Sequence, residues 1–264
     1  MPDVLRVAVV QFGAEPGDVA TNLDAMRRFL ARAQDGGADI AVFPELCLSG
    51  YVLDPAAYTA ELLADVERAE TSLAAAAAST AIVYGAPVRV RDGLANATVL
   101  VRPDKTRTVY AKTHMDVKER RVFAPGAEFV AADGVGLACC YDLAFPEPAR
   151  ILALAGALAL LVPMAWEVER GFVMERVVAA RAVENVAYVV CANQTGVRGA
   201  FRFRGASCVV DPVGERVLSM GAEENLAVVE LDLARVDALR AQLDSTTYPL
   251  LVDRRPELYS PVAQ

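Results

Sequence analysis

Apolar and polar positions follow two rhythms along the chain. In the first, apolar residues recur every three or four positions, which is typical of a helix with one buried face. In the second, short apolar runs are bounded by glycine, proline or polar residues, which indicates strands. The first rhythm predicts helices over residues 18–34, 56–78, 146–155, 168–185 and 233–243. The second predicts strands over residues 5–11, 40–43, 81–90, 97–101, 106–110, 136–140, 157–162, 187–193, 207–211, 216–219 and 227–231.

The order of these elements predicts an α/β fold. Strands and helices alternate in both halves of the chain, which is typical of strands that are buried on at least one face. Some neighbouring strands are joined by short polar turns, so we expect a mixed sheet rather than a purely parallel one. The sequence has no internal repeat, low-complexity segment or linker. We therefore expect one domain over residues 1–264.

Composition and charge narrow the class of partner. The chain has 264 residues, 55% of them hydrophobic, which is enough to bury a large core. The net charge of −8 argues against nucleic acid and against an anionic membrane surface. The most apolar stretch, residues 151–166, is too short to cross a bilayer and contains Pro163. The N-terminal segment lacks the basic start and apolar core of a secretory signal.

The cysteines and the histidine limit the possible chemistry. His114 is the only histidine, and no Cys-x-x-Cys occurs, which excludes most histidine-rich metal sites and any second catalytic histidine. An odd number of cysteines in apolar surroundings predicts reduced thiols in a cytoplasmic protein. The five are Cys47, Cys139, Cys140, Cys191 and Cys208.

Cys140 is the candidate nucleophile. It ends an apolar strand pattern and is followed by a short turn and by Pro146, which can open a helix. A thiol at such a junction faces the ligand crevice of an open α/β sheet, and helix-end amides favour its thiolate. Cys139 is expected to point the opposite way. The ordinary alternative for Cys140 is an inert buried cysteine.

Three upstream residues are candidate partners for the thiol. Glu45 follows a short apolar strand and is suited to general-base work if its surroundings raise its pKa. His114 is the other candidate base. Lys112 can supply an ammonium that stabilises a tetrahedral oxyanion, together with the backbone N–H of Tyr141. The charged run that contains Glu119, residues 118–121, reads from its pattern alone as a solvated surface.

Glu45, Lys112 and Cys140, in this chain order, resemble the Glu-Lys-Cys triad of the nitrilase superfamily of carbon–nitrogen hydrolases. The resemblance covers nearly the whole chain. Residues 43–51 look like the first family motif, 112–115 like the lysine motif, 119–126 like the segment with a second glutamate, and 140–147 like the nucleophile motif, while 181–185 and 253–259 resemble downstream family segments.

The resemblance implies a four-layer α-β-β-α sandwich and a homodimer or higher homo-oligomer. It implies that Glu45 takes the Cys140 proton, that the thiolate attacks a carbonyl or nitrile carbon, and that Lys112 and the Tyr141 amide hold the oxyanion. A thioester acyl-enzyme is then hydrolysed by water that Glu45 activates. Glu119 becomes a second carboxylate that positions Lys112 or the substrate. The resemblance implies neither a metal nor an organic cofactor.

The residues around the motifs favour the amidase-like branch. Tyr141-Asp142 follows the cysteine where true nitrilases tend to have Trp-Glu. Ala144 stands where many relatives carry arginine, which weakens any expectation of an anionic substrate end. Trp166 lies in a region that lines the family's pocket, so it is a candidate substrate wall or a core aromatic. Asn193 follows the next strand and is a candidate polar contact or an ordinary turn residue.

The leading hypothesis is hydrolysis of a small non-peptide amide to a carboxylic acid and ammonia. An N-carbamoyl (ureido) amide hydrolase is a close rival, and a nitrilase is a weaker one. A non-catalytic small-molecule binding protein on the same fold is the alternative of a different class. A thiol protease that pairs Cys140 with His114 predicts that loss of His114 abolishes activity while loss of Glu45 does not.

Overall fold

Two six-stranded sheets form the centre of the computed structural model, which describes residues 2–244 and 250–259. The first sheet has the strand order β14-β1-β2-β3-β4-β5 and the second β13-β12-β9-β8-β7-β6. The strands of the first are β1 (Val4–Gln11), β2 (Ile40–Val42), β3 (Ala81–Val90), β4 (Gly93–Val101), β5 (Arg107–Ala111) and β14 (Asn225–Asp232). Those of the second are β6 (Val130–Ala132), β7 (Val135–Leu137), β8 (Ala159–Met164), β9 (Tyr188–Asn193), β12 (Cys208–Val210) and β13 (Arg216–Ser219).

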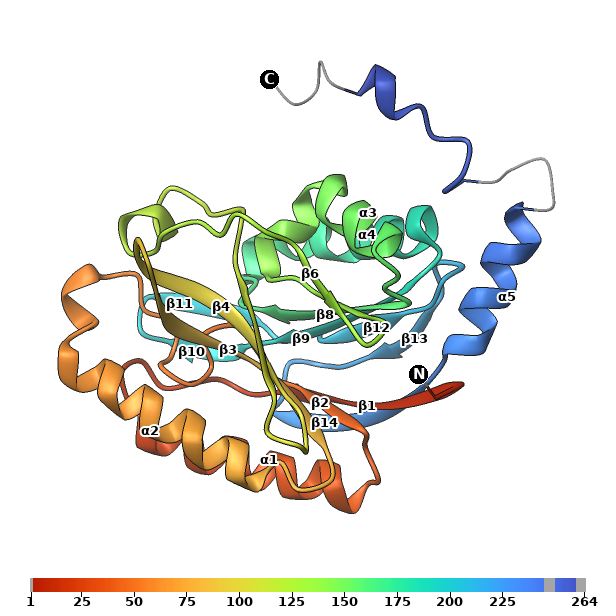
Figure 1. The fold of residues 1–264 in the computed structure, drawn as a ribbon. Coiled ribbons are helices and arrows are strands. Elements are labelled where there is room, and N and C mark those ends of the chain that lie inside the picture. Colours follow the sequence, from red (N-terminus) through yellow and green to blue (C-terminus); the bar gives the residue numbers. More distant parts are fainter. Residues whose placement is uncertain (1, 245–249, 260–264) are drawn as a thin grey trace.

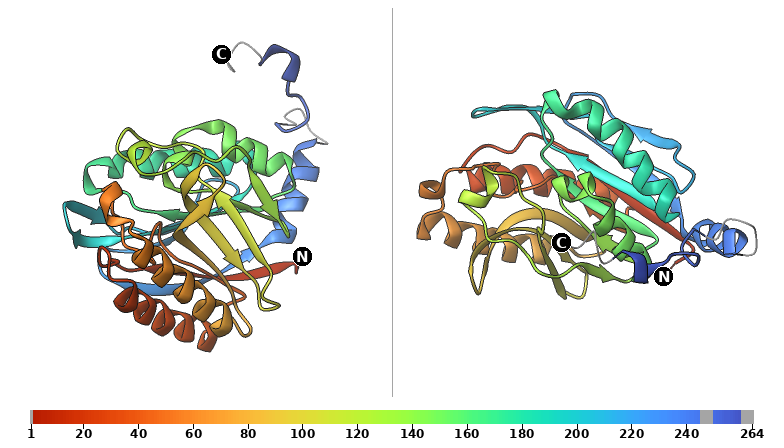
Figure 2. Two further views of the ribbon diagram at one scale, coloured as in Figure 1. Left: turned by 60° about the vertical axis from the view of Figure 1, so that its left-hand side comes forward. Right: turned by 90° about the horizontal axis from the view of Figure 1, so that it is seen from above.

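Helices cover the outer faces of the two sheets, so the molecule has four layers (Figures 1 and 2). The first sheet packs on α1 (Val19–Asp35) and α2 (Ala60–Ala76), and the second packs on α3 (Pro146–Leu154) and α4 (Gly171–Asn185). A further helix, α5 (Leu233–Asp244), follows β14 and lies beside β1. The expected α-β-β-α sandwich is confirmed. Both of its sheets are mixed, whereas the strand pattern alone predicted a single mixed sheet.

Strand β1 shows how the alternating pattern builds these layers. Val7 and Val9 belong to the core between the sheets, whereas Ala8 and Val10 face the helices α1 and α2. Successive side chains of a strand point to opposite faces, so a strand buried on both faces reads as an unbroken apolar run. The run at the start of the chain therefore contributes to two cores.

Local capping sets where the helices begin. Asp18 accepts from the Thr21 backbone N–H at 3.0 Å and starts α1 where the pattern predicted. The predicted helix over residues 56–78 starts too early, because Thr59 caps α2 and residues 55–57 form a separate 3₁₀ turn. The predicted helix from 168 divides in the same way into a 3₁₀ turn (Val168–Arg170) and α4.

Three strands were not predicted, and the strand that leads to Cys140 was predicted to extend too far. A hairpin of β10 (Thr195–Arg198) and β11 (Phe201–Arg204) stands apart from both sheets, and β6 pairs with β7 at a sheet edge. Strand β7 ends at Leu137, so Cys140 lies in the following 3₁₀ turn (Cys140–Ala144) rather than in a strand. No helix in the described ranges has the length and apolar character that a membrane span requires.

Candidate active site

The Glu45 carboxylate is placed by a tight loop after β2. Leu46 has a φ of +46°, a backbone conformation that non-glycine residues rarely adopt. The loop crosses β3 at Gly85, whose N–H donates to the Pro44 carbonyl at 3.0 Å. A Cβ on Gly85 would lie 2.2 Å from the Leu46 nitrogen, so only glycine permits this approach. Glu45 is thereby held completely buried at the end of its strand.

Lys112 follows β5 and is fixed through its own backbone. Its N–H donates to the Asn96 carbonyl on β4 at 2.9 Å, and its carbonyl accepts from the Gly126 N–H at 2.9 Å. The side chain is only 1% exposed. A buried ammonium requires anionic or strong acceptor partners, and the neighbouring side chains provide them.

Lys112 lies between two carboxylates. Its Nζ is 2.7 Å from Glu45 Oε1 and 2.5 Å from Glu119 Oε1. Asn96 Nδ2 donates to the same two oxygens, at 2.7 and 3.2 Å. The sequence-predicted Glu45, Lys112 and Glu119 are therefore in direct contact, and Glu119 is buried rather than part of a solvated surface.

The two oxygens of Glu45 differ in their hydrogen bonds. Oε1 accepts from Lys112, from Asn96 and from the Cys139 thiol, whose Sγ lies 3.3 Å away. Oε2 is buried and has no hydrogen-bond partner among the described residues. An unpaired buried carboxylate oxygen is costly, and in a site of this kind it is available to accept a proton.

Cys140 occupies a strained position at the start of the 3₁₀ turn. Its φ is +44°, which costs a non-glycine residue of order 1–2 kcal/mol. The residue is 7% exposed and its side chain lines a cavity, whereas Cys139 is completely buried and points to Glu45. The two adjacent thiols thus point in different directions, and Cys140 is the one at the cavity.

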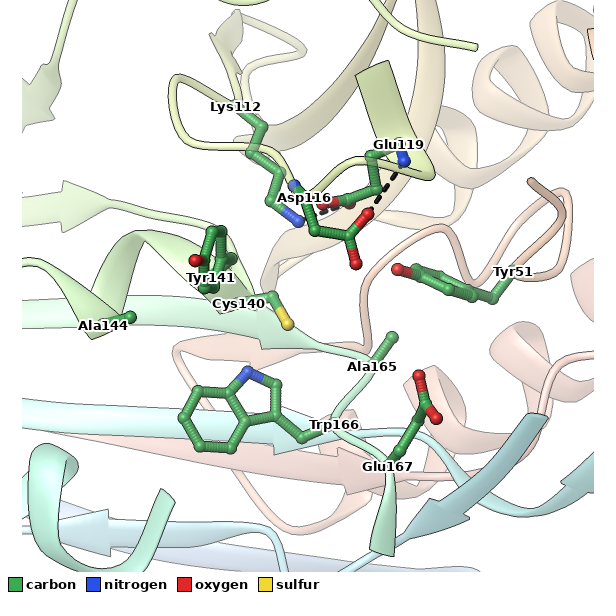
Figure 3. Close-up of a pocket in the computed structure, with 10 residues that line it drawn as sticks. All are labelled: Tyr51, Lys112, Asp116, Glu119, Cys140, Tyr141, Ala144, Ala165, Trp166 and Glu167. Carbon is green, nitrogen blue, oxygen red and sulfur yellow. Dashed lines mark hydrogen bonds and ion pairs between the residues drawn. The ribbon is translucent and has the colours of Figure 1, made fainter. Parts of the chain in front are cut away.

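The cavity, of about 160 Å³, lies where these segments meet (Figure 3). Lys112 and Glu119 face it from one wall, and Cys140 and Tyr141 face it from the 3₁₀ turn. The remaining lining side chains are Tyr51, Asp116, Ala144, Ala165, Trp166 and Glu167.

Burial and charge set the protonation states of the site. Burial, and then the charge of Glu45, raise the pKa of the Cys140 thiol well above its usual value, although Lys112 acts to lower it. Burial alone would lower the pKa of the Lys112 ammonium, but Glu45 and the other acidic neighbours outweigh it and raise that pKa well above the usual value. Burial also raises the pKa of the Glu119 carboxyl, with Lys112 opposing. At neutral pH the site holds a neutral thiol beside an ammonium, so attack requires a base.

A buried aspartate joins the 3₁₀ turn that begins at Cys140 to the segment that follows Lys112. Asp142 accepts hydrogen bonds from the Tyr110 hydroxyl at 2.8 Å and from the backbone N–H groups of Cys139 and His114 at 2.9 and 3.0 Å. The Thr113 hydroxyl and His114 Nδ1 also lie 3.1 and 3.0 Å from it. His114 therefore contacts Asp142 and is not a lining residue of the cavity.

Trp166 and Asn193 have different positions. Trp166 lines the cavity just beyond β8. Asn193, on β9, accepts from the Trp166 backbone N–H at 2.8 Å and donates to the carbonyls of Trp166 and Gly205 at 3.3 and 2.7 Å. The Asn193 amide thus fixes the backbone of Trp166. Asn193 itself is not a lining residue of the cavity.

Four residues of the site were not singled out from the sequence: Asn96, Tyr51, Asp116 and Glu167. Asn96 carried a usable signal, because it is an amide side chain inside a mostly apolar stretch of β4. Such a residue needs buried partners. The other three lie in loops, where periodicity gives no direction for a side chain.

Sequence comparisons relate the chain to known hydrolases. The family model for carbon–nitrogen hydrolases matches residues 6–241. The chain is 38% identical to a Pseudomonas protegens protein named "Hydrolase in pqqF 5'region", over 98% of this chain and 92% of that protein. It is 34% identical to an (R)-stereoselective amidase of Pseudomonas sp., over 95% of this chain and 92% of the amidase.

Solved structures agree with these relatives. An amidase from Nesterenkonia sp. superposes with a TM-score of 0.84 at 31% identity, over 98% of this chain and 96% of that one. Further structures of the Nesterenkonia sp. AN1 amidase hold butyramide in a cysteine-to-alanine mutant, or the acetamide moiety of fluoroacetamide added covalently at the active site cysteine. The matched family model, the curated relatives and these amidase structures together show that the chain belongs to the carbon–nitrogen hydrolase family, in the amidase-like branch of the nitrilase superfamily.

Proposed function

We propose that this protein hydrolyses small non-peptide amides to a carboxylic acid and ammonia, with Cys140 as nucleophile. The observation that carries the proposal is the free Oε2 of Glu45, in a carboxylate whose other oxygen contacts Lys112. A base with one fixed and one free oxygen, a buried ammonium and a cavity-facing thiol are the groups that acyl transfer needs. Membership in the carbon–nitrogen hydrolase family supports the same chemistry.

Acylation begins when Glu45 takes the proton of the Cys140 thiol as its sulfur attacks the amide carbon. The carbonyl oxygen becomes an oxyanion, which the Lys112 ammonium and the Tyr141 backbone N–H stabilise. The proton held by Glu45 passes to the amide nitrogen, the carbon–nitrogen bond breaks, and ammonia leaves. Glu119 keeps Lys112 charged and oriented through its 2.5 Å contact.

Deacylation uses the same groups, with a water molecule as the nucleophile in place of the thiol. Glu45 takes a proton from a water molecule that attacks the thioester carbon, and the same two donors stabilise the second oxyanion. The carbon–sulfur bond breaks, the proton returns to Cys140, and the carboxylic acid leaves. Trp166 and Ala165 provide the apolar wall against which a short acyl chain packs.

Two related reactions use the same groups. A ureido substrate would release carbon dioxide and an amine with its ammonia, and a nitrile would pass through a thioimidate. The Tyr141-Asp142 pair after the nucleophile and the amide-bound relatives favour the amide reaction. Assembly as a homodimer or higher homo-oligomer, a cytoplasmic location and one domain over residues 1–264 stay predictions from the sequence.

The test is ammonia release from a panel of aliphatic amides, ω-amides and ureido compounds. We expect the unmutated protein to release ammonia from short amides and Cys140→Ala to release none. The matched control is Cys191→Ala, which removes a buried thiol from β9 and should remain active. Equal release by Cys140→Ala and the parent would overturn the assignment of the nucleophile. Turnover confined to ureido compounds would instead support N-carbamoyl amide hydrolysis. Ligand binding without any turnover would favour a non-catalytic binding protein.

A further inference from the structure

The charged groups around the cavity are mostly acidic. Asp116, Glu119 and Glu167 line it together with one cation, Lys112. That cation already contacts two carboxylates, Glu45 and Glu119. An anionic substrate end would find no uncommitted cation among the described lining residues, and it would meet further carboxylates instead.

Asp116 and Glu167 are the two lining carboxylates that have oxygens available to bind a ligand. Among the described side chains, neither has an ion-pair partner. Asp116 uses Oδ1 to accept from the backbone N–H groups of Lys118 and Glu119, at 2.7 and 2.9 Å, and its Oδ2 accepts no hydrogen bond from a described residue. The Glu167 carboxylate makes no hydrogen bond to a described residue. Both carboxylates point into the cavity from opposite sides (Figure 3).

Tyr51 lies between them and has an unused hydroxyl. Its side chain is buried, with 8% of the residue exposed, and its hydroxyl points into the cavity without a hydrogen-bond partner among the described residues (Figure 3). Burial, and then the charges of Glu45 and Glu119, raise the pKa of this phenol well above its usual value. Tyr51 therefore stays neutral and offers a lone pair in a negative field, which suits a donor-rich cation.

The rest of the cavity is apolar and short. Ala144, Ala165 and the Trp166 ring provide walls for a few methylene groups. The cationic side chains of Lys118 and Arg121 line a neighbouring groove that lies beyond Tyr51, and the Lys118 ammonium sits over the Phe201 ring. These cations do not line the catalytic cavity.

From these contacts we propose that the preferred substrates are primary amides whose short acyl chain ends in an alkylammonium group, bound by Glu167, Asp116 and the Tyr51 hydroxyl. This inference rests on the proposed amidase activity and specifies its substrate class. In this mode of binding the amide carbon lies at Cys140 and the methylene groups pack on Trp166. The ammonium exchanges its hydrogen bonds to water for charge-assisted hydrogen bonds to the two carboxylates and the Tyr51 hydroxyl.

The test compares three amides of similar length: 4-aminobutanamide, neutral pentanamide and anionic succinamate. We expect kcat/KM to be highest for 4-aminobutanamide, by about tenfold or more over pentanamide, and lowest for succinamate, because a hydrogen bond to a charged group is worth about tenfold to hundredfold. Added salt should reduce the advantage of the cation and leave pentanamide unaffected. Equal or lower kcat/KM for 4-aminobutanamide would overturn the inference.

Variants of Glu167 locate the effect. Glu167→Gln should lower the ratio of kcat/KM for 4-aminobutanamide over pentanamide by about tenfold, and Glu167→Lys should move the preference towards succinamate. The matched control is Glu169→Gln, because Glu169 is exposed and pairs with Arg202 at 2.9 Å. If this kcat/KM ratio is unchanged in both Glu167 variants, the inference about the cationic substrate is wrong. Continued turnover of pentanamide would in that case still support the proposed amidase activity. Absence of turnover on all three amides would count against both proposals.

Discussion

At the scale of single residues, the two carboxylate oxygens of Glu45 differ in their hydrogen bonds. Oε1 is held by three donors, and Oε2 has none among the described residues. The three donors fix the carboxylate plane, so the free oxygen has a defined direction without a bond of its own. In the proposed mechanism Lys112 therefore has two roles, since it stabilises the oxyanion and also orients the Glu45 carboxylate.

The proposed role of Glu45 as general base is tested by an isosteric change. Glu45→Gln keeps the volume of the side chain and its contact with Lys112 but cannot accept the thiol proton. We expect kcat to fall by about 10²- to 10⁴-fold, the usual contribution of a general base. His114→Ala, which removes one contact to Asp142, should cost no more than about tenfold. Steady-state kinetics on one amide would decide, and the reverse ranking would indicate a Cys-His mechanism.

The raised pKa of Cys140 predicts slow alkylation near neutral pH. An ordinary thiol has a pKa of about 8.5, and burial and Glu45 place that of Cys140 well above this range. The fraction of thiolate is therefore small at pH 7 and grows as pH rises. We expect the iodoacetamide rate, followed by mass spectrometry with Cys140→Ala as the blank, to keep rising through pH 9. A plateau at neutral pH would show a resting thiolate instead.

The site residues whose positions could be predicted had a chemical type and a motif in the sequence, and their roles stay predictions. Glu45, Lys112 and Cys140 each follow an apolar strand, and the family resemblance joined them. Asn96 had only its polar character inside a mostly apolar strand, and Tyr51 had no mark at all. The partners of Asn96, Glu45 and Glu119, come from distant segments of the chain. Contacts of that kind depend on how β4 and the loop after β2 meet, which no local pattern contains.

At the scale of elements, the site depends on a close crossing between a loop and a strand. The loop that carries Glu45 contacts β3 at Gly85, where a Cβ would meet the backbone of Leu46 and Glu45 at 2.2 and 2.5 Å. Gly85→Ala should therefore displace the carboxylate. A shift of about 1 Å can cost 10²-fold in rate, so we expect at least a tenfold fall in kcat/KM.

The matched control for this change is Gly221→Ala. A Cβ at Gly221 has no atom within 4 Å, so both activity and the urea midpoint should be kept. The Gly85→Ala variant should also lose about 1–3 kcal/mol of unfolding free energy, the usual cost of overpacking. Full activity of Gly85→Ala would mean that the Glu45 loop can move without harm.

The elements that sequence patterns predicted poorly are those under tertiary control. The strand predicted over residues 136–140 cannot include Cys140, because the φ of +44° at this residue is one that no regular strand contains. The hairpin of β10 and β11 carries arginines at Arg198, Arg202 and Arg204, so its strands do not read as apolar runs. By contrast β3 has the bounds that its pattern predicted, because it is buried over most of its length.

At the scale of the whole molecule, one apolar core unites the two sheets. Val83 from the first sheet and Leu161 from the second belong to the same buried cluster, which also includes Cys140. The alternating pattern predicted that strands are buried, but only the family resemblance placed them in two stacked sheets. Periodicity names the face of a strand, and it does not say which other strand that face meets.

The left-handed backbone of Cys140 sets catalysis against folding at one position. A nucleophile needs a side chain, whereas a φ of +44° favours a residue with none. Of two inactive variants, Cys140→Gly should therefore unfold with about 1 kcal/mol more free energy than Cys140→Ala. In the control, Ala149→Gly in α3 should have a lower free energy of unfolding than the unmutated protein, because glycine destabilises a helix interior. Urea unfolding measures both pairs. If Cys140 is the nucleophile as proposed, selection for stability alone would remove the thiol, and selection for turnover would retain it.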